Sequence, residues 1–170
     1  MFKKRLVLAF IVLMLVIIMS GCLNSEEDTI EESETVVKEM FLSDAEIERN
    51  FEAEEFKMYK PESLEFSESR GQNLIFFEEE QPYILFINEL EAPNSKWYYD
   101  ELKQKEEQLH LRTFETEEQF AYYSVKEKEE GQYEVQVGIG GVKMATKTEA
   151  DDLIDDVQEM MKMVKSINTK

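Results

Sequence analysis

Apolar and polar residues follow two different periods along the chain, and these periods separate the expected strands from the expected helices. Alternating or nearly all-apolar short runs are typical of β-strands, whereas apolar residues at i, i+3, i+4 and i+7 mark one face of a helix. Strand-like runs cover residues 56–60, 64–66, 74–77, 83–87, 111–114, 120–125 and 133–139. The nearly all-apolar run 83–87 predicts a central strand covered on both faces. Residues 129–132 have the composition of a hairpin loop.

The clearest helical pattern lies near the C-terminus. Its apolar stripe consists of Leu153, Ile154, Val157, Met160, Met161, Val164 and Ile167. A second helix is expected over about 96–108, capped by Ser95, and a short third one after Ser43, where Ser43 and Glu46 have capping-box spacing. Strands joined by short turns, with helices between and after them, predict an α+β fold: a mainly antiparallel sheet packed by helices, including a long amphipathic C-terminal helix.

The first 22 residues have the layout of a secretory signal peptide. Lys3, Lys4 and Arg5 precede an uncharged apolar stretch, which ends in Ser20-Gly21-Cys22. This ending resembles the lipobox of bacterial lipoproteins. The resemblance implies cleavage before Cys22, acylation of its thiol and anchoring to the lipid bilayer on the extracytoplasmic face of the cell membrane. The alternative is an uncleaved anchor, since residues 6–23 form an uncharged run of 18 residues.

Composition divides the remaining chain into a spacer and one domain. Residues 1–21 are the expected signal peptide, 22–42 the lipid-anchored acidic spacer and 43–170 a single α+β domain. The spacer is predicted to be disordered over 23–35, which are rich in Asn, Ser, Glu, Asp and Thr. Cleavage leaves 149 of the 170 residues, which suffices for one domain. Cys22 is the only cysteine, so the domain contains no disulfide.

The charge of the chain limits its partners. It has 19 basic and 38 acidic residues, and three of the basic ones lie in the signal peptide, so the mature part has 16 basic and 38 acidic residues and a formal charge of −22. Nucleic-acid binding requires a high density of lysine and arginine. The strongly acidic charge therefore excludes nucleic-acid binding as a natural activity of this chain. Broad contact with anionic headgroups is also disfavoured, so we expect the domain to stand off the membrane.

No group of residues indicates a catalytic, cofactor or metal site, and we expect a protein that is not an enzyme. The glycine-rich segment 138–143 lacks the third glycine of a dinucleotide loop, so a strand bulge or bend is favoured. His110, the only histidine, has no nucleophile nearby in the sequence and is expected to be structural or exposed. The four aspartates of 151–156 lack the glycine turn of a calcium loop, and a solvated helix start is expected. Met160 and Met161 are core fillers.

Lysines and aromatic residues provide the candidate partner contacts. Lys143 and Lys147 lie in the segment 140–147, which is a candidate contact loop. Trp97 and Tyr99 belong to a surplus of aromatic residues. Adjacent rings occur at Phe76–Phe77 and Tyr122–Tyr123. Because neighbouring residues in a strand point to opposite faces, one ring of each pair needs a covering helix or forms an exposed patch for a partner. A covering helix is the favoured alternative.

Two segments resemble the PsbP-like family and its bacterial relatives of the DcrB type. One is Phe56-x-x-Tyr59-x-Pro61 with Leu64 just beyond, and the other is the closing helix that ends in Met163-Val164-Lys165-Ser166-Ile167. The resemblance extends over about 56–167. It implies a small exported domain with an antiparallel sheet covered by helices, an accessory or assembly role, and no shared catalytic residues.

The sequence therefore predicts a membrane-anchored lipoprotein that serves as a non-catalytic accessory or protein-binding module for another envelope protein. One alternative is a lipoprotein that binds a small ligand or cation, and a second is a carboxylate-dependent cell-wall hydrolase. A bacterium with a single membrane is the favoured host.

Overall fold

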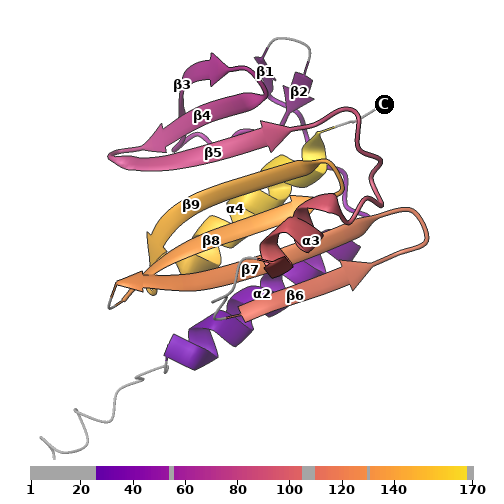
Figure 1. Cartoon of the computed structure of the whole chain (residues 1–170). Coiled ribbons are helices and arrows are strands. Elements are labelled where there is room, and N and C mark those ends of the chain that lie inside the picture. Colours follow the sequence, from indigo (N-terminus) through magenta and orange to yellow (C-terminus); the bar gives the residue numbers. More distant parts are fainter. Residues whose placement is uncertain (1–25, 54–55, 105–109, 130, 168–170) are drawn as a thin grey trace, which may run out of the picture.

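A seven-stranded antiparallel sheet forms the centre of the computed structural model, which describes residues 26–53, 56–104, 110–129 and 131–167 (Figure 1). The strand order is β3-β4-β5-β9-β8-β7-β6. The strands are β3 (Glu65–Arg70), β4 (Asn73–Glu78), β5 (Gln81–Ile87), β6 (His110–Glu115), β7 (Phe120–Glu129), β8 (Gln132–Ile139) and β9 (Val142–Glu149). Two short strands, β1 (Phe51–Ala53) and β2 (Phe56–Met58), form a separate antiparallel pair. The predicted α+β class is confirmed.

Helices lie on both faces of the sheet. The helices α2 (Glu26–Leu42) and α4 (Leu153–Ser166) pack side by side on one face, here called the inner face, and α3 (Trp97–Gln104) lies on the opposite, outer face (Figure 1). The predicted stripe of α4 is buried in the core at Leu153, Val157, Met160, Met161 and Val164. The amphipathic C-terminal helix is therefore confirmed, and it supplies a large share of the inner core.

The prediction of an acidic spacer over 22–42 is wrong for residues 26–42, which form α2. Ile30, Ser33, Val37 and Phe41 are buried on one side of this helix, at intervals of three to four residues. The Ser33 Oγ lies 2.5 Å from the Tyr123 Oη, so the one polar member of the stripe is hydrogen-bonded. The many acidic residues of this segment occupy the solvent side, and the composition concealed a sparse but regular apolar stripe.

The short helix expected after Ser43 is also wrong, because residues 43–50 run without regular structure past the end of α4. The end of α2 is capped instead by Lys165 of α4, whose Nζ donates to the carbonyl oxygens of Met40 (2.8 Å), Phe41 (3.0 Å) and Ser43. The last carbonyls of a helix have no intrahelical partner, and a cation there also complements the helix dipole. Burial lowers the pKa of Lys165.

The segment 140–147 is not a loop beyond Gly141, since β9 begins at Val142 and lies between β5 and β8. Its inward residues Val142, Met144, Thr146 and Thr148 are buried, and the residues between them face outward. The predicted glycine bend is the β8–β9 turn. Gly140 has a φ of 52°, and a Cβ there would lie 2.5 Å from the Ala92 carbonyl oxygen. Only glycine fits this turn without displacing the neighbouring loop.

The solvated start expected for the C-terminal helix is wrong for one of its four aspartates. Asp156 is buried, and its carboxylate accepts hydrogen bonds from the Tyr83 Oη (2.5 Å) and from the Gln81 Nε2 (2.9 Å). Burial, followed by the hydrogen bond to Asp156, raises the pKa of Tyr83. These contacts join the first turn of α4 to β5 and fix the helix on the inner face.

The burial of α2 yields a first prediction. Replacing Phe41, which is 3% exposed, with alanine should lower the free energy of unfolding by about 3–5 kcal/mol, because a large core side chain is lost. Replacing its neighbour Leu42, which is 51% exposed, should change the free energy by less than about 1 kcal/mol. Urea unfolding of both variants measures the difference. Equal, small losses would mean that α2 does not belong to the core.

Candidate functional site

A row of aligned residues crosses the outer face of all seven strands. From β3 to β6 it consists of Glu68, Ile75, Ile84, Ala145, Gln136, Ser124 and Leu111, each directly opposite the next. Aligned partners in neighbouring antiparallel strands project from the same face of a sheet. The row is apolar over β4, β5 and β9 and polar over β8 and β7, so the outer face has two chemically different halves.

Helix α3 covers one part of this face. Tyr98, Phe120 and Tyr122 form a buried cluster with Phe86, Tyr99 and Leu102 packed against it. The Tyr98 ring centroid lies 5.6 Å from that of Phe86, and the Tyr99 centroid lies 5.5 Å from that of Phe120. The favoured expectation that a helix covers the outward ring of Tyr122–Tyr123 is therefore confirmed for Tyr122.

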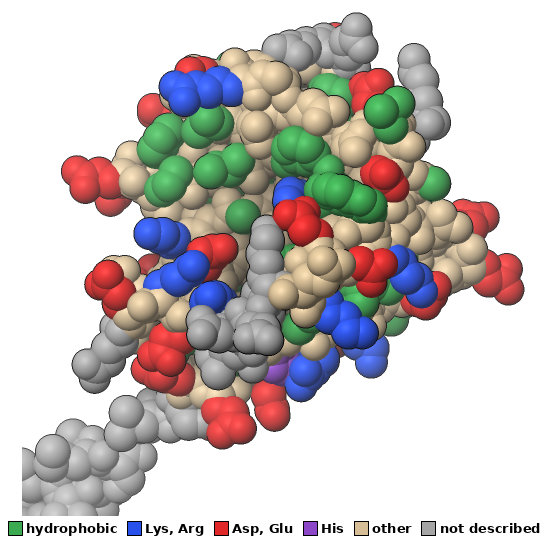
Figure 2. All heavy atoms as spheres, in the orientation of Figure 1, with side chains coloured by type: hydrophobic (Ala, Val, Ile, Leu, Met, Phe, Trp, Pro, Cys, Tyr) green, Lys and Arg blue, Asp and Glu red, His purple; other side chains and the backbone are tan. Residues whose placement is uncertain are grey.

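The other part of the face is uncovered. Ile84 is 43% exposed, and Ile75, Phe77, Pro82 and Ala145 around it are partly exposed. We call these five residues the open patch. Figure 2 shows hydrophobic side chains gathered over β4 and β5. The prediction that 83–87 is covered on both faces is wrong at Ile84, which is exposed. Phe77 is the outward ring of the Phe76–Phe77 pair, and no helix among the described residues covers it.

Three of the four predicted contact residues meet at the N-terminal end of α3. The Lys143 Nζ lies 4.3 Å from the centroid of the Tyr98 ring and 5.5 Å from that of Phe86, close enough for cation–π attraction. The Trp97 centroid lies 4.9 Å from that of Tyr98, and Trp97 is 55% exposed. Tyr99, the third, is half-buried against Phe120. Trp97 and Lys143 therefore form an aromatic and cationic border next to the open patch.

Lys147, the fourth predicted contact residue, projects from the same face of β9 and is exposed. It stands four residues from Lys143, which corresponds to about 13 Å along the strand. Glu134 of β8 lies directly opposite Lys147, and Lys126 of β7 lies opposite Glu134 on its other side. The structure thus places all four predicted residues on the outer face, but Lys147 lies apart from the other three.

The proposed lipidation residue, Cys22, lies outside the described residues. Within the described ranges, no helix has the length and apolar character needed to cross a membrane. In the same part of the chain, no three His, Cys, Asp or Glu side chains are placed to hold a metal ion together.

The structure adds a close contact between Tyr122 and Gly138 that the sequence analysis did not predict. Tyr122 lies opposite Gly138, and a Cβ on Gly138 would fall 2.4 Å from the Tyr122 Cε1, so the ring lies across the glycine. Burial raises the pKa of Tyr122 well above its usual value, and its Oη has no hydrogen-bond partner among the described residues. Glycine inside a strand often marks such a close approach, and this was the one available sequence signal.

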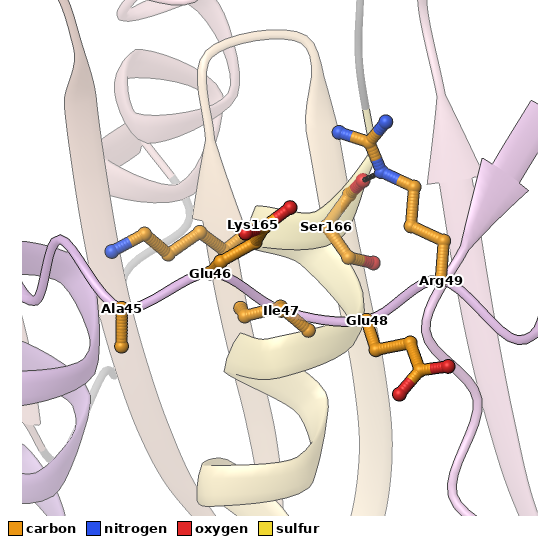
Figure 3. Close-up of a pocket in the computed structure, with 7 residues that line it drawn as sticks. All are labelled: Ala45, Glu46, Ile47, Glu48, Arg49, Lys165 and Ser166. Carbon is orange, nitrogen blue, oxygen red and sulfur yellow. Dashed lines mark hydrogen bonds between the residues drawn. The ribbon is translucent and has the colours of Figure 1, made fainter.

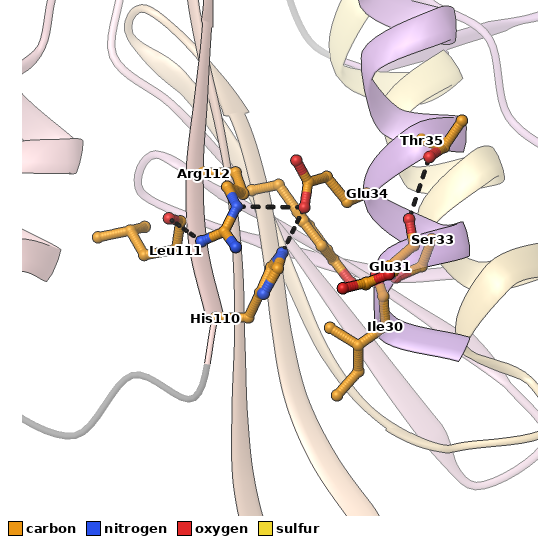
Figure 4. Close-up of polar contacts among 9 residues, drawn as sticks. Ile30, Glu31, Ser33, Glu34, Thr35, His110, Leu111 and Arg112 are labelled. Atoms are coloured by element: carbon orange, nitrogen blue, oxygen red, sulfur yellow. Dashed lines mark hydrogen bonds and ion pairs between the residues drawn. The ribbon is translucent and has the colours of Figure 1, made fainter. Parts of the chain in front are cut away.

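His110 takes part in a contact between α2 and β6 on the inner face (Figure 4). Its Nε2 lies 2.6 Å from the Glu34 Oε2, and the Arg112 Nε lies 3.2 Å from the same oxygen. A pocket of about 530 Å³ opens beside it, lined by side chains that include Glu26, Glu31 and Glu127. The geometry is that of a helix fastened to a sheet edge, which agrees with the structural reading of this histidine.

A larger hollow of about 690 Å³ lies between residues 45–49 and the end of α4 (Figure 3). The Arg49 Nε donates to the Ser166 carbonyl oxygen at 2.7 Å, whereas Lys165 is turned toward the end of α2. Figure 3 shows these two cationic side chains pointing away from each other. They do not converge on a common anion, and the outer face remains the stronger candidate.

No protein-family model matches the chain, and no curated protein is significantly similar to it. The resemblance to the PsbP-like family stays a prediction.

The close fit of Tyr122 over Gly138 yields a second prediction. Gly138→Ala should lower the free energy of unfolding by about 1–3 kcal/mol, because the ring and the α3 cluster above it must shift. In a Tyr122→Ala background the same change should cost less than about 0.5 kcal/mol, since the obstructing ring is absent. Urea unfolding of the four proteins gives the coupling energy. An equal cost in both backgrounds would contradict the packing described here.

Proposed function

We propose that this chain is a membrane-anchored extracytoplasmic lipoprotein whose outer sheet face binds another protein of the cell envelope, with no catalytic role of its own. The observation that carries the proposal is the open patch. Its members form a continuous apolar surface on three neighbouring strands, because Ile75 lies opposite Ile84 and Ile84 lies opposite Ala145. Contiguous exposed apolar surface, especially with a polar rim, is typical of protein interaction sites.

The residues that border the open patch indicate what kind of surface the partner presents. Lys126, Lys143 and Lys147 project from the outer face of β7 and β9, although the mature chain has a formal charge of −22. Figure 2 shows lysine and arginine side chains beside the hydrophobic ones on this face. Trp97 at the border is a residue type enriched in binding hot spots. On the β9 side of the patch the complementary surface is therefore apolar at its centre and acidic at its edge, whereas Glu68 of β3 lies opposite Ile75 on the other side.

Substitution of the patch tests this proposal. Ile84→Asp should reduce capture of the partner by roughly tenfold or more, because it places an unpaired carboxylate at the centre of the interface. Leu42→Asp is the matched control, since Leu42 is a similarly exposed aliphatic residue at the end of α2. Capture is measured by chemical crosslinking in intact cells, followed by quantitative mass spectrometry of the membrane fraction. Thermal unfolding verifies that both variants are folded.

The lysine rim gives a second arm to the same experiment. Lys147→Glu should weaken capture by roughly two- to fivefold, with a larger effect at low ionic strength, because rim charges act mainly through long-range attraction. Lys38→Glu, at an exposed lysine on α2, should leave capture unchanged. The proposal is contradicted if Ile84→Asp and Leu42→Asp capture the same proteins to the same extent.

A further inference from the structure

Helix α2 leaves little room between the anchor and the folded domain. It begins at Glu26, and Ile30, one turn later, is already buried in the core. Only residues 23–25 separate Cys22 from Glu26. Extended chain spans at most about 3.6 Å per residue, so the Cα atoms of these two residues lie no more than about 15 Å apart. An acylated Cys22 therefore keeps the first turn of α2 close to the lipid headgroups.

The ends of the domain can be assigned from what surrounds each end of α2. The start of the helix shares a pocket with Glu127, close to the β7–β8 turn. The end of the helix shares a hollow with residues 116–119 of the β6–β7 turn. With 17 residues, α2 is about 25 Å long and runs along the length of the sheet (Figure 1). We call the end of the domain at the start of α2 the near end, because the anchor holds it close to the lipid, and it includes the β7–β8 turn. The opposite end, which includes the β6–β7 turn, is the far end.

The near end is strongly acidic. Besides the start of α2 it includes the β4–β5 turn, because Tyr83 lies opposite Thr146 and Gln132 lies opposite Glu149 at the same end of β9. Its acidic residues include Glu26, Glu27, Glu79, Glu80, Glu127, Glu129 and Glu149. The tether fixes this end beside the lipid, and repulsion between anionic headgroups and a mature chain with a formal charge of −22 favours an orientation in which the rest of the domain points away from the bilayer. The lipid surface is thus an unfavourable occupant of the patch.

We infer that the domain stands end-on at the bilayer, with the open patch facing sideways along the membrane, and that the partner is a protein held in the same membrane. The inference rests on the proposed function and on acylation of Cys22. Ala145 is four residues from Glu149, or about 13 Å along the strand, so the patch lies within about 30 Å of the headgroups. A membrane protein with a short extracytoplasmic segment, apolar and bordered by acidic residues, meets it at that height.

Energy transfer from two single-cysteine variants tests the orientation. Cys22 is the only native cysteine, so the introduced thiol is the only one free for labelling once Cys22 is acylated. Glu80→Cys labels the near end and Glu117→Cys the far end, and both positions are exposed. The lipidated full-length proteins are placed in phosphatidylcholine–phosphatidylglycerol vesicles that contain acceptor-labelled lipid. Transfer should be clearly stronger from position 80 than from position 117. Equal or reversed transfer overturns the end-on orientation.

Lengthening the tether tests the partner class. Inserting 20 glycine and serine residues between Ser25 and Glu26 increases the largest distance that the domain can reach from the bilayer. It also lowers the effective concentration of the domain at a partner that is fixed in the membrane. Capture in intact cells should then fall several-fold, while a scrambled-order insert of equal length serves as the control for sequence effects. Unchanged capture with the long tether means that the partner is not fixed in the membrane and overturns this inference. The proposed function fails separately, through the comparison of Ile84→Asp with Leu42→Asp.

Discussion

Strand alternation is the constraint on which this structure depends. Successive side chains point to opposite faces, so the adjacent rings of Phe76–Phe77 and Tyr122–Tyr123 oblige the sheet to bury apolar surface on both sides. Two helices, α2 and α4, cover the inner face, whereas α3, with eight residues, covers only part of the outer face. Those eight residues cover Tyr122 and one end of Phe86, and Ile84 is left exposed. The open patch is an apolar part of the outer face that the described helices do not reach.

The inner face is completed by a helix that depends on contacts from distant parts of the chain. Few apolar residues of α2 are buried, and its acidic sequence alone is a weak helix–sheet anchor. Lys165 binds the carbonyl oxygens at its end, Tyr123 meets Ser33 at its middle, and His110 and Arg112 meet Glu34 on its side. Fixing α2 in this way also fixes where the chain enters the domain, and this entry point determines how an anchored domain faces the membrane.

The sequence predicted the elements whose apolar period is dense, such as the α4 stripe and the strands around Phe76, Tyr123 and Val135. It failed where composition and period disagreed. The many acidic residues of α2 led to the prediction of a spacer, although Ile30, Val37 and Phe41 recur at helical intervals. Two glycines suggested a loop after β8, although Val142, Met144 and Thr146 alternate with outward residues as in a strand. Of the candidate site, Lys143, Lys147, Trp97 and Tyr99 were predicted individually. Their grouping with Ile84 depends on strand pairings between distant residues, which local patterns do not specify.

The central claim is that a partner covers the open patch in the cell. The most direct measurement is the accessibility of a cysteine at position 84 to a membrane-impermeant maleimide, compared with a cysteine at the similarly exposed position 42. In the isolated domain both should react readily. In intact cells the account predicts that Ile84→Cys is protected and that Leu42→Cys reacts as before. Equal reactivity of the two positions in cells would contradict the account.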